Sequence, residues 1–191
     1  MLDLETFSTS PSAAIVQIGA VRFDLDNGPF GAYFTFERTI ALQSSILAGG
    51  EVDAATIAWW RTQSIKAKAG ISSYLDDPGT LASALDAFTT WFPMGAFLWS
   101  HGAAFDVPVL ESAFRSLRMS IPWDYWQVRD TRTLFDLART FAGWEKLASE
   151  TAHTALADAV AQARDVRAAH VALTARIIKP AAVYERIGDV R

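Results

Sequence analysis

The hydrophobic pattern of this chain changes near residue 54, and that change restricts the folds it can adopt. Before it, residues 1–7, 13–23 and 32–39 have the character of strands, because the second is rich in β-branched side chains and the third alternates aromatic with polar ones. The sequence DNGP at 26–29 is a strong turn signal between the last two. We therefore predict an N-terminal β-meander.

After residue 54 the apolar positions recur at helical spacing. A short apolar run at 96–100 reads as a buried strand, and Pro180 marks the end of the last helix. The predicted helices span 54–63, 78–92, 104–117, 131–141 and 154–178. Strands followed by helices that alternate with further strands indicate an α/β fold, with a mixed sheet flanked by helices.

Length and composition are those of a single globular domain. The 191 residues contain no linker or low-complexity segment, so we expect one domain over 1–191, with 180–191 as a loose tail or a partner contact. The absence of cysteine excludes disulfides, thiol catalysis and Cys-ligated zinc, and it fits a cytoplasmic protein. No apolar run reaches the roughly 18 residues of a membrane span, so we expect no membrane association.

Asp3 and Glu5 are the first candidate metal ligands. Alternation along a strand puts positions i and i+2 on one face, about 6–7 Å apart. Two carboxylates on a core-facing strand repel each other unless a cation lies between them. Taken alone, the pair has a simpler interpretation as a solvent-facing strand end.

Three further candidates lie far along the chain. Asp106 follows the predicted strand 96–100 and falls in the first turn of a helix, where the helix dipole stabilises an acid by roughly 0.3–1 kcal/mol. Thr154 is a plausible N-cap, which leaves His153 on the preceding loop and Asp158 on the helix. Each residue also has an ordinary structural interpretation, so the case depends on all of them meeting in space.

The order and type of these residues resemble one known pattern. The chain resembles the DEDDh branch of the DEDD 3′–5′ exonucleases, which have a ribonuclease H-like fold. The three motifs are Asp3-Leu4-Glu5-Thr6, His101-Gly102-Ala103-Ala104-Phe105-Asp106 and His153-Thr154-Ala155-Leu156-Ala157-Asp158-Ala159. Further similarity to the phage and bacterial subgroup that includes the catalytic part of exodeoxyribonuclease VIII and related exoribonucleases lies at 8–15, 59–64 and 129–133.

The resemblance implies a two-metal phosphodiester hydrolase. Asp3, Glu5, Asp106 and Asp158 would hold two Mg²⁺ or Mn²⁺ ions about 4 Å apart, and His153 would act as the general base. Without these four acids the net charge of −4 becomes about zero, which suits a cleft for one strand end better than a coat for duplex DNA. The family's first strand usually starts earlier relative to the residue that matches Asp3. A frayed first strand would position Asp3 poorly, so activity requires that this strand be firmly paired.

Substrate contacts are expected from residues near the motifs. Thr6 would meet the terminal nucleotide, as the resemblance suggests. Phe7 and Trp60 are the chosen aromatic faces for stacked bases, although Trp60 also reads as a core anchor. Arg132, with Arg129, would contact phosphates or else lie on a charged helix flank.

Several alternatives remain open from the sequence. Single-stranded RNA and DNA 3′ ends, or overhangs, are equally compatible with these residues. A catalytically silent binding or scaffold module would keep the fold without needing all five site residues. A carboxylate-pair glycosidase would use Asp3 and Glu5 and leave the other three idle. Relatives are often dimers, and the Ala-rich C-terminal helix offers a surface for a homodimer.

Overall fold

A computed structural model describes residues 1–25, 34–72, 79–146 and 154–178. The five strands of its sheet are β1 (Leu2–Thr6), β2 (Ile15–Val21), β3 (Thr35–Thr39), β4 (Leu98–Ser100) and β5 (Val128–Asp130). The helices are α1 (Leu42–Leu47), α2 (Ala54–Thr62), α3 (Ile65–Ser72), α4 (Leu81–Trp91), α5 (Asp106–Ser116), α6 (Thr131–Ala142) and α7 (Ala155–Ile178), with a 3₁₀ turn η3 (Tyr125–Gln127). The predicted turn at 26–29, the tail 180–191 and His153 lie outside the described residues.

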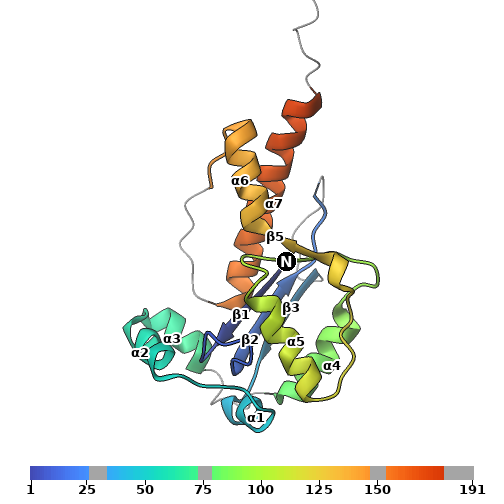
Figure 1. Ribbon diagram of the computed structural model, residues 1–191. Helices are drawn as coiled ribbons and strands as arrows, with labels where there is room; N and C mark the ends of the chain where they lie inside the picture. Colours follow the sequence, from blue (N-terminus) through green and yellow to red (C-terminus); the bar gives the residue numbers. More distant parts are fainter. Residues whose placement is uncertain (26–33, 73–78, 147–153, 179–191) are drawn as a thin grey trace, which may run out of the picture.

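The strands form one mixed sheet in the order β3-β2-β1-β4-β5. The first three are antiparallel, as predicted for a meander, and β4 and β5 run parallel to β1. Helices cover both faces (Figure 1). The α/β architecture expected from the change of period is therefore present.

The two faces of the sheet have separate apolar cores. On one face, Leu2, Leu4 and Ile18 pack with buried side chains of α4 and α5. On the other, Val21 packs with α6 and α7, and α7 contributes four alanines at 0% exposure: Ala155, Ala159, Ala163 and Ala169. Such small side chains let α7 approach the sheet closely, so the Ala-rich sequence predicted as a helix also determines its distance from β1 and β2.

β1 is firmly held from its first residues. The Met1 ammonium donates to the Val21 carbonyl at 2.8 Å, and the Val21 amide donates back to the Met1 carbonyl at 2.9 Å. Leu2 pairs with Ala20 on one side and with Ser100 on the other. Asp3 therefore stands on a paired strand, which meets the requirement for its support.

Short elements were missing from the predicted order. Helices α1 and α3 and strand β5 have eight residues or fewer, too short for a periodic pattern to show. The predicted strand 96–100 is shorter in the structure, and the long helices agree within three residues at each described end. In the part of the chain that the structure describes, no helix has both the length and the apolar character needed to cross a membrane.

Candidate metal centre and its surroundings

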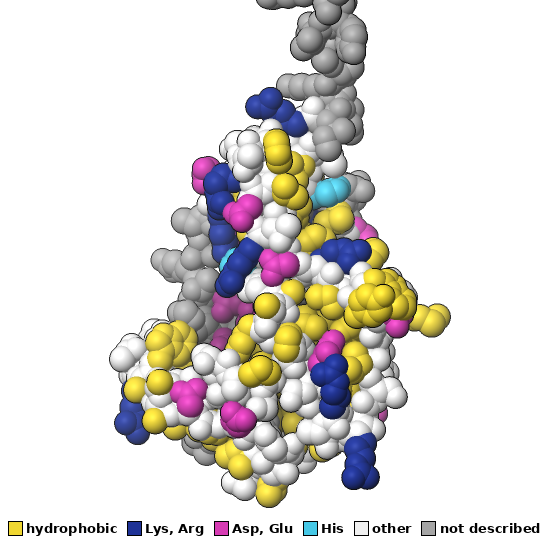
Figure 2. Space-filling model, in the orientation of Figure 1, with side chains coloured by type: hydrophobic (Ala, Val, Ile, Leu, Met, Phe, Trp, Pro, Cys, Tyr) yellow, Lys and Arg dark blue, Asp and Glu magenta, His cyan; other side chains and the backbone are white. Residues whose placement is uncertain are grey.

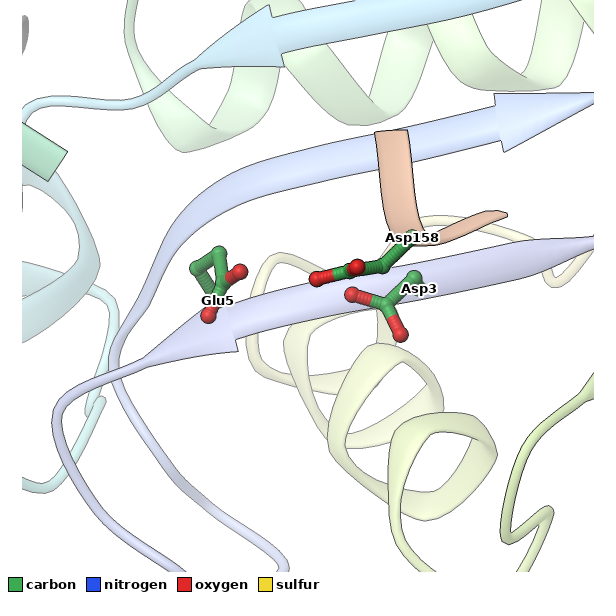
Figure 3. A group of neighbouring side chains, drawn as sticks. All are labelled: Asp3, Glu5 and Asp158. Carbon is green, nitrogen blue, oxygen red and sulfur yellow. The ribbon is translucent and has the colours of Figure 1, made fainter. Parts of the chain in front are cut away.

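Three carboxylates from opposite ends of the chain meet above β1. Asp3 and Glu5 alternate with the core residues Leu2 and Leu4, so their side chains leave the opposite face of the strand. Asp158 reaches them from the first turn of α7 (Figure 3). Each residue offers an oxygen within 4.8 Å of the oxygens offered by the other two, which is the spacing of ligands around a shared cation.

A glycine on β2 allows this meeting. Gly19 pairs with Asp3 across the sheet, and a Cβ built on it would lie 2.1 Å from the backbone of Ala155. The first turn of α7 therefore rests directly on β2, where only glycine leaves room. The side-chain oxygen of Gln17 accepts a hydrogen bond from the Ala155 amide at 3.2 Å, which fixes the helix start beside the site.

Asp106 lies beside this trio rather than within it. It stands in the first turn of α5, as predicted, and is 5% exposed. Its carboxylate accepts hydrogen bonds from the Ser100 hydroxyl and from the Leu4 backbone. β4 pairs with β1 only at Leu2. Beyond that point the Asp106 carboxylate, rather than a strand, accepts the hydrogen bond from the Leu4 backbone.

The four acids repel one another in a region shielded from water. Burial, followed by the charges of Asp106 and Glu5, raises the pKa of Asp3 well above its usual value. Burial and the charge of Asp158 raise the pKa of Glu5 to about 8, and burial raises that of Asp106 to about 6. A bound cation would relieve this repulsion, and the all-oxygen donors of the site suit a hard divalent cation such as Mg²⁺ or Mn²⁺.

Asp130 links two segments that lie near Asp106. Its carboxylate accepts from the Ala103 amide at 2.7 Å and from the Arg132 amide at 2.8 Å, so it ties the loop before α5 to the start of α6. The exposed Arg132 guanidinium lies 3.3 Å from the position that a Cβ on Gly102 would occupy. Its charge partly offsets the rise that burial causes in the pKa of Asp106, so Arg132 lies near this carboxylate.

Phe7 and Trp60 are buried beneath the end of β1. The Trp60 indole N–H donates to the Thr6 carbonyl at 2.9 Å, and the ring is 3% exposed; Phe7 is 8% exposed. The Thr6 hydroxyl donates to the Ser8 carbonyl at 2.8 Å. Both rings support the strand that carries Glu5, which favours a packing role, and the stacking of bases on Phe7 and Trp60 stays a prediction.

Two residues near the site were missed by the sequence analysis. Trp59 is 47% exposed, and its ring centroid lies 4.9 Å from that of Trp60. Gln162 donates from Nε2 to Asp3 Oδ1 at 2.8 Å. The spacing of four residues from Asp158 to Gln162 places both on one helix face, and this signal was available in the sequence.

Comparisons with known proteins agree with this geometry. The chain is similar to the crystal structure of cell-death related nuclease 4 (CRN-4), with a TM-score of 0.62 and 15% identity over 87% of this chain and 61% of that protein. The chain thus spans less than two thirds of that protein's length, and the likeness confirms the ribonuclease H-like fold. A comparison with curated protein sequences found no match. Residues 1–170 match a known domain family, and the chain therefore belongs to the 3′–5′ exoribonuclease Rv2179c-like domain family.

Proposed function

We propose that this chain is a metal-dependent 3′–5′ exonuclease that shortens single-stranded RNA from its 3′ end. The observation that carries the proposal is the meeting of Asp3, Glu5 and Asp158, each offering an oxygen within 4.8 Å of the others, on a family fold of 3′–5′ exoribonucleases. RNA is the substrate favoured by the family description, and DNA 3′ ends are the competing substrate. The similarity to exodeoxyribonuclease VIII seen in the sequence stays a prediction.

The four carboxylates have separate parts in this proposal. Asp3, Glu5 and Asp158 would hold the cations directly, while Asp106, which Ser100 and Leu4 already bind, would complete the site from the α5 side. Mg²⁺ or Mn²⁺ bound there would polarise the scissile phosphate and lower the pKa of the attacking water. His153 would accept the proton of that water, since an imidazole with a pKa near 6.5 is half neutral close to physiological pH.

The incoming strand would lie along the lobe formed by α2 and α3. This segment contains Arg61 and Lys68 and no acidic residue, although the whole chain has a net charge of −4. Figure 2 shows hydrophobic side chains on this lobe, next to a hollow in which acidic side chains are visible. Exposed aromatic rings bind single strands by stacking on their bases, so we choose Trp59, which is 47% exposed, rather than Trp60 as the stacking residue.

Arg132 would bind a phosphate on the opposite side of the acids. Its guanidinium is exposed and lies beside Gly102, and its charge acts on Asp106. A guanidinium near a carboxylate site can hold the phosphate while the cations hold its other oxygens. The predicted role of Arg132 in substrate binding is therefore kept.

End-labelled RNA and DNA test the proposal directly. Single strands and duplexes with 3′ overhangs are incubated with the protein in Mn²⁺ or in EDTA, and the products are separated on a sequencing gel. We expect stepwise shortening from the 3′ end in Mn²⁺ alone, abolished by Asp3→Asn and slowed roughly 10²–10⁴-fold by His153→Ala. Internal cleavage products, or shortening in EDTA, would show that the proposed chemistry is wrong.

The alternative function is a catalytically silent binding module, and assays on the same protein distinguish it from an exonuclease. A silent module would bind the labelled strands without shortening them in either metal. Mn²⁺-dependent thermal stabilisation that disappears in Asp3→Asn would show that the carboxylates hold a cation, and shortening would then show that the bound cation supports hydrolysis.

A further inference from the structure

Gln162 is a polar side chain of α7 that contacts Asp3, a proposed metal ligand, and is not itself a proposed ligand. It is 9% exposed and lies one helical turn after Asp158. Its Nε2 donates to Asp3 Oδ1 at 2.8 Å. The bond joins α7 to β1, the two elements that also supply the three clustered carboxylates.

The orientation of the Gln162 amide follows from its partner. A cation-binding Asp3 is ionised and accepts hydrogen bonds only, so the amide then presents its NH₂ group to Asp3, which is the orientation in the structure. The amide oxygen then points elsewhere. This Oε1 atom is buried and has no hydrogen-bond partner among the residues that the structure describes. Buried acceptors without a partner are rare in folded proteins and mark places where an ion or a water is to be expected.

We infer that Gln162 is a positioning residue of the metal site: its Nε2 fixes the Asp3 carboxylate in its ligating orientation, and its Oε1 accepts a hydrogen bond from a water that a hydrated divalent ion brings with it. Mg²⁺ keeps several of its waters when it binds to proteins, so such a donor comes with the ion. The inference rests on the proposed function, since it requires a cation at Asp3.

A role in packing alone would not require these atoms. The neighbours of Gln162 on α7 include Ala159 and Ala163, which are fully buried among apolar side chains, and an apolar residue of similar volume would fill the same space. Groups that hydrogen-bond a ligating carboxylate typically change metal affinity 10–100-fold when they are replaced. Metal affinity and metal-free stability therefore separate the two roles.

The experiment compares the full-length wild type with Gln162→Met by Mn²⁺ titration calorimetry and by metal-free thermal unfolding. We expect the Kd for Mn²⁺ to rise 10–100-fold in the variant. The metal-free Tm should stay within about 3 °C of wild type, because the lost hydrogen bond is offset by the removal of a buried acceptor without a partner. Gln162→Asn, which keeps the amide on a shorter side chain, should weaken Mn²⁺ binding as well and serves if the methionine variant does not fold.

Gln127 offers a matched control. It is 7% exposed and ends η3 just before β5, where it donates to the Ala96 carbonyl at 2.9 Å and accepts from the Asp124 amide at 2.6 Å. Gln127→Met should lower the Tm and leave the Kd for Mn²⁺ unchanged. An unchanged Kd in both Gln162 variants, with Mn²⁺ bound by the wild type, overturns the inference alone. A wild type that binds no Mn²⁺ overturns the proposed function and this inference with it.

Discussion

Replacing Glu5 by glutamine should make the metal-free protein more stable, although it removes a proposed ligand. The folded-state pKa of Glu5 is raised from 4.5 to about 8, by burial and by the charges of Asp158 and Asp106. At pH 7 the folded protein therefore keeps a proton on Glu5 that the unfolded chain releases. The stability of the wild type falls as the pH rises from about 4.5 to about 8, because the unfolded state binds fewer protons over this range.

The size of the effect follows from the same shift. Between pH 4.5 and pH 7 the penalty grows by about 1.4 kcal/mol per pH unit, which gives about 3 kcal/mol at pH 7. Glutamine resembles the protonated side chain and cannot ionise, so Glu5→Gln avoids the penalty. For a domain of 191 residues this corresponds to a rise in Tm of roughly 6–12 °C.

Urea unfolding followed by circular dichroism, in EDTA at pH 4 and at pH 7, measures the difference. We expect equal stability at pH 4 and a gain for the variant at pH 7. Saturating Mn²⁺ should reverse the order, because binding stabilises the wild type by mass action and the variant less. Glu37→Gln on the exposed face of β3 is the matched control and should change neither value by more than about 0.5 kcal/mol.

This prediction fails if Glu5→Gln is no more stable than wild type at pH 7 without metal. It fails also if the gain is the same at both pH values, since ionisation of Glu5 would then have no part in it. In either case ionised Glu5 would not destabilise the metal-free fold, and the argument from its burial and from the charges of Asp158 and Asp106 would be wrong.

Three further predictions follow from the geometry. Mn²⁺ binding at pH 7 should release at least the proton that Glu5 carries, and calorimetry in buffers of different ionisation enthalpy will count the protons released; no release would contradict the raised pKa of Glu5. Gly19→Ala should destabilise the protein by about 3 kcal/mol and weaken Mn²⁺ binding, because its Cβ displaces the start of α7; unchanged urea unfolding would refute this. Trp59→Ala should raise KM for single-stranded RNA with kcat within a few-fold, whereas Trp60→Ala should cost about 3–5 kcal/mol of stability; equal effects of the two on KM would contradict their separation.

Much of the fold was predictable because its signals are local. The β-branched run became β2, which is buried along its whole length, and the long Ala-rich pattern became α7. Motif order likewise selected Asp3, Glu5 and Asp158, which the structure brings together, since the family pattern is a property of the chain itself. The short α1, α3 and β5 escaped, because segments of this length owe their conformation to neighbours rather than to periodicity.

The sequence by itself determined the chemistry available to this protein: carboxylates at 3, 5, 106 and 158, in strand and helix positions that their surroundings in the chain specify. The tertiary structure decided how those groups are used. Which of two adjacent tryptophans is buried depends on which face of α2 meets β1, and the partner of Gln162 lies 159 residues away. Such contacts arise from the packing of distant segments, and no local pattern encodes them.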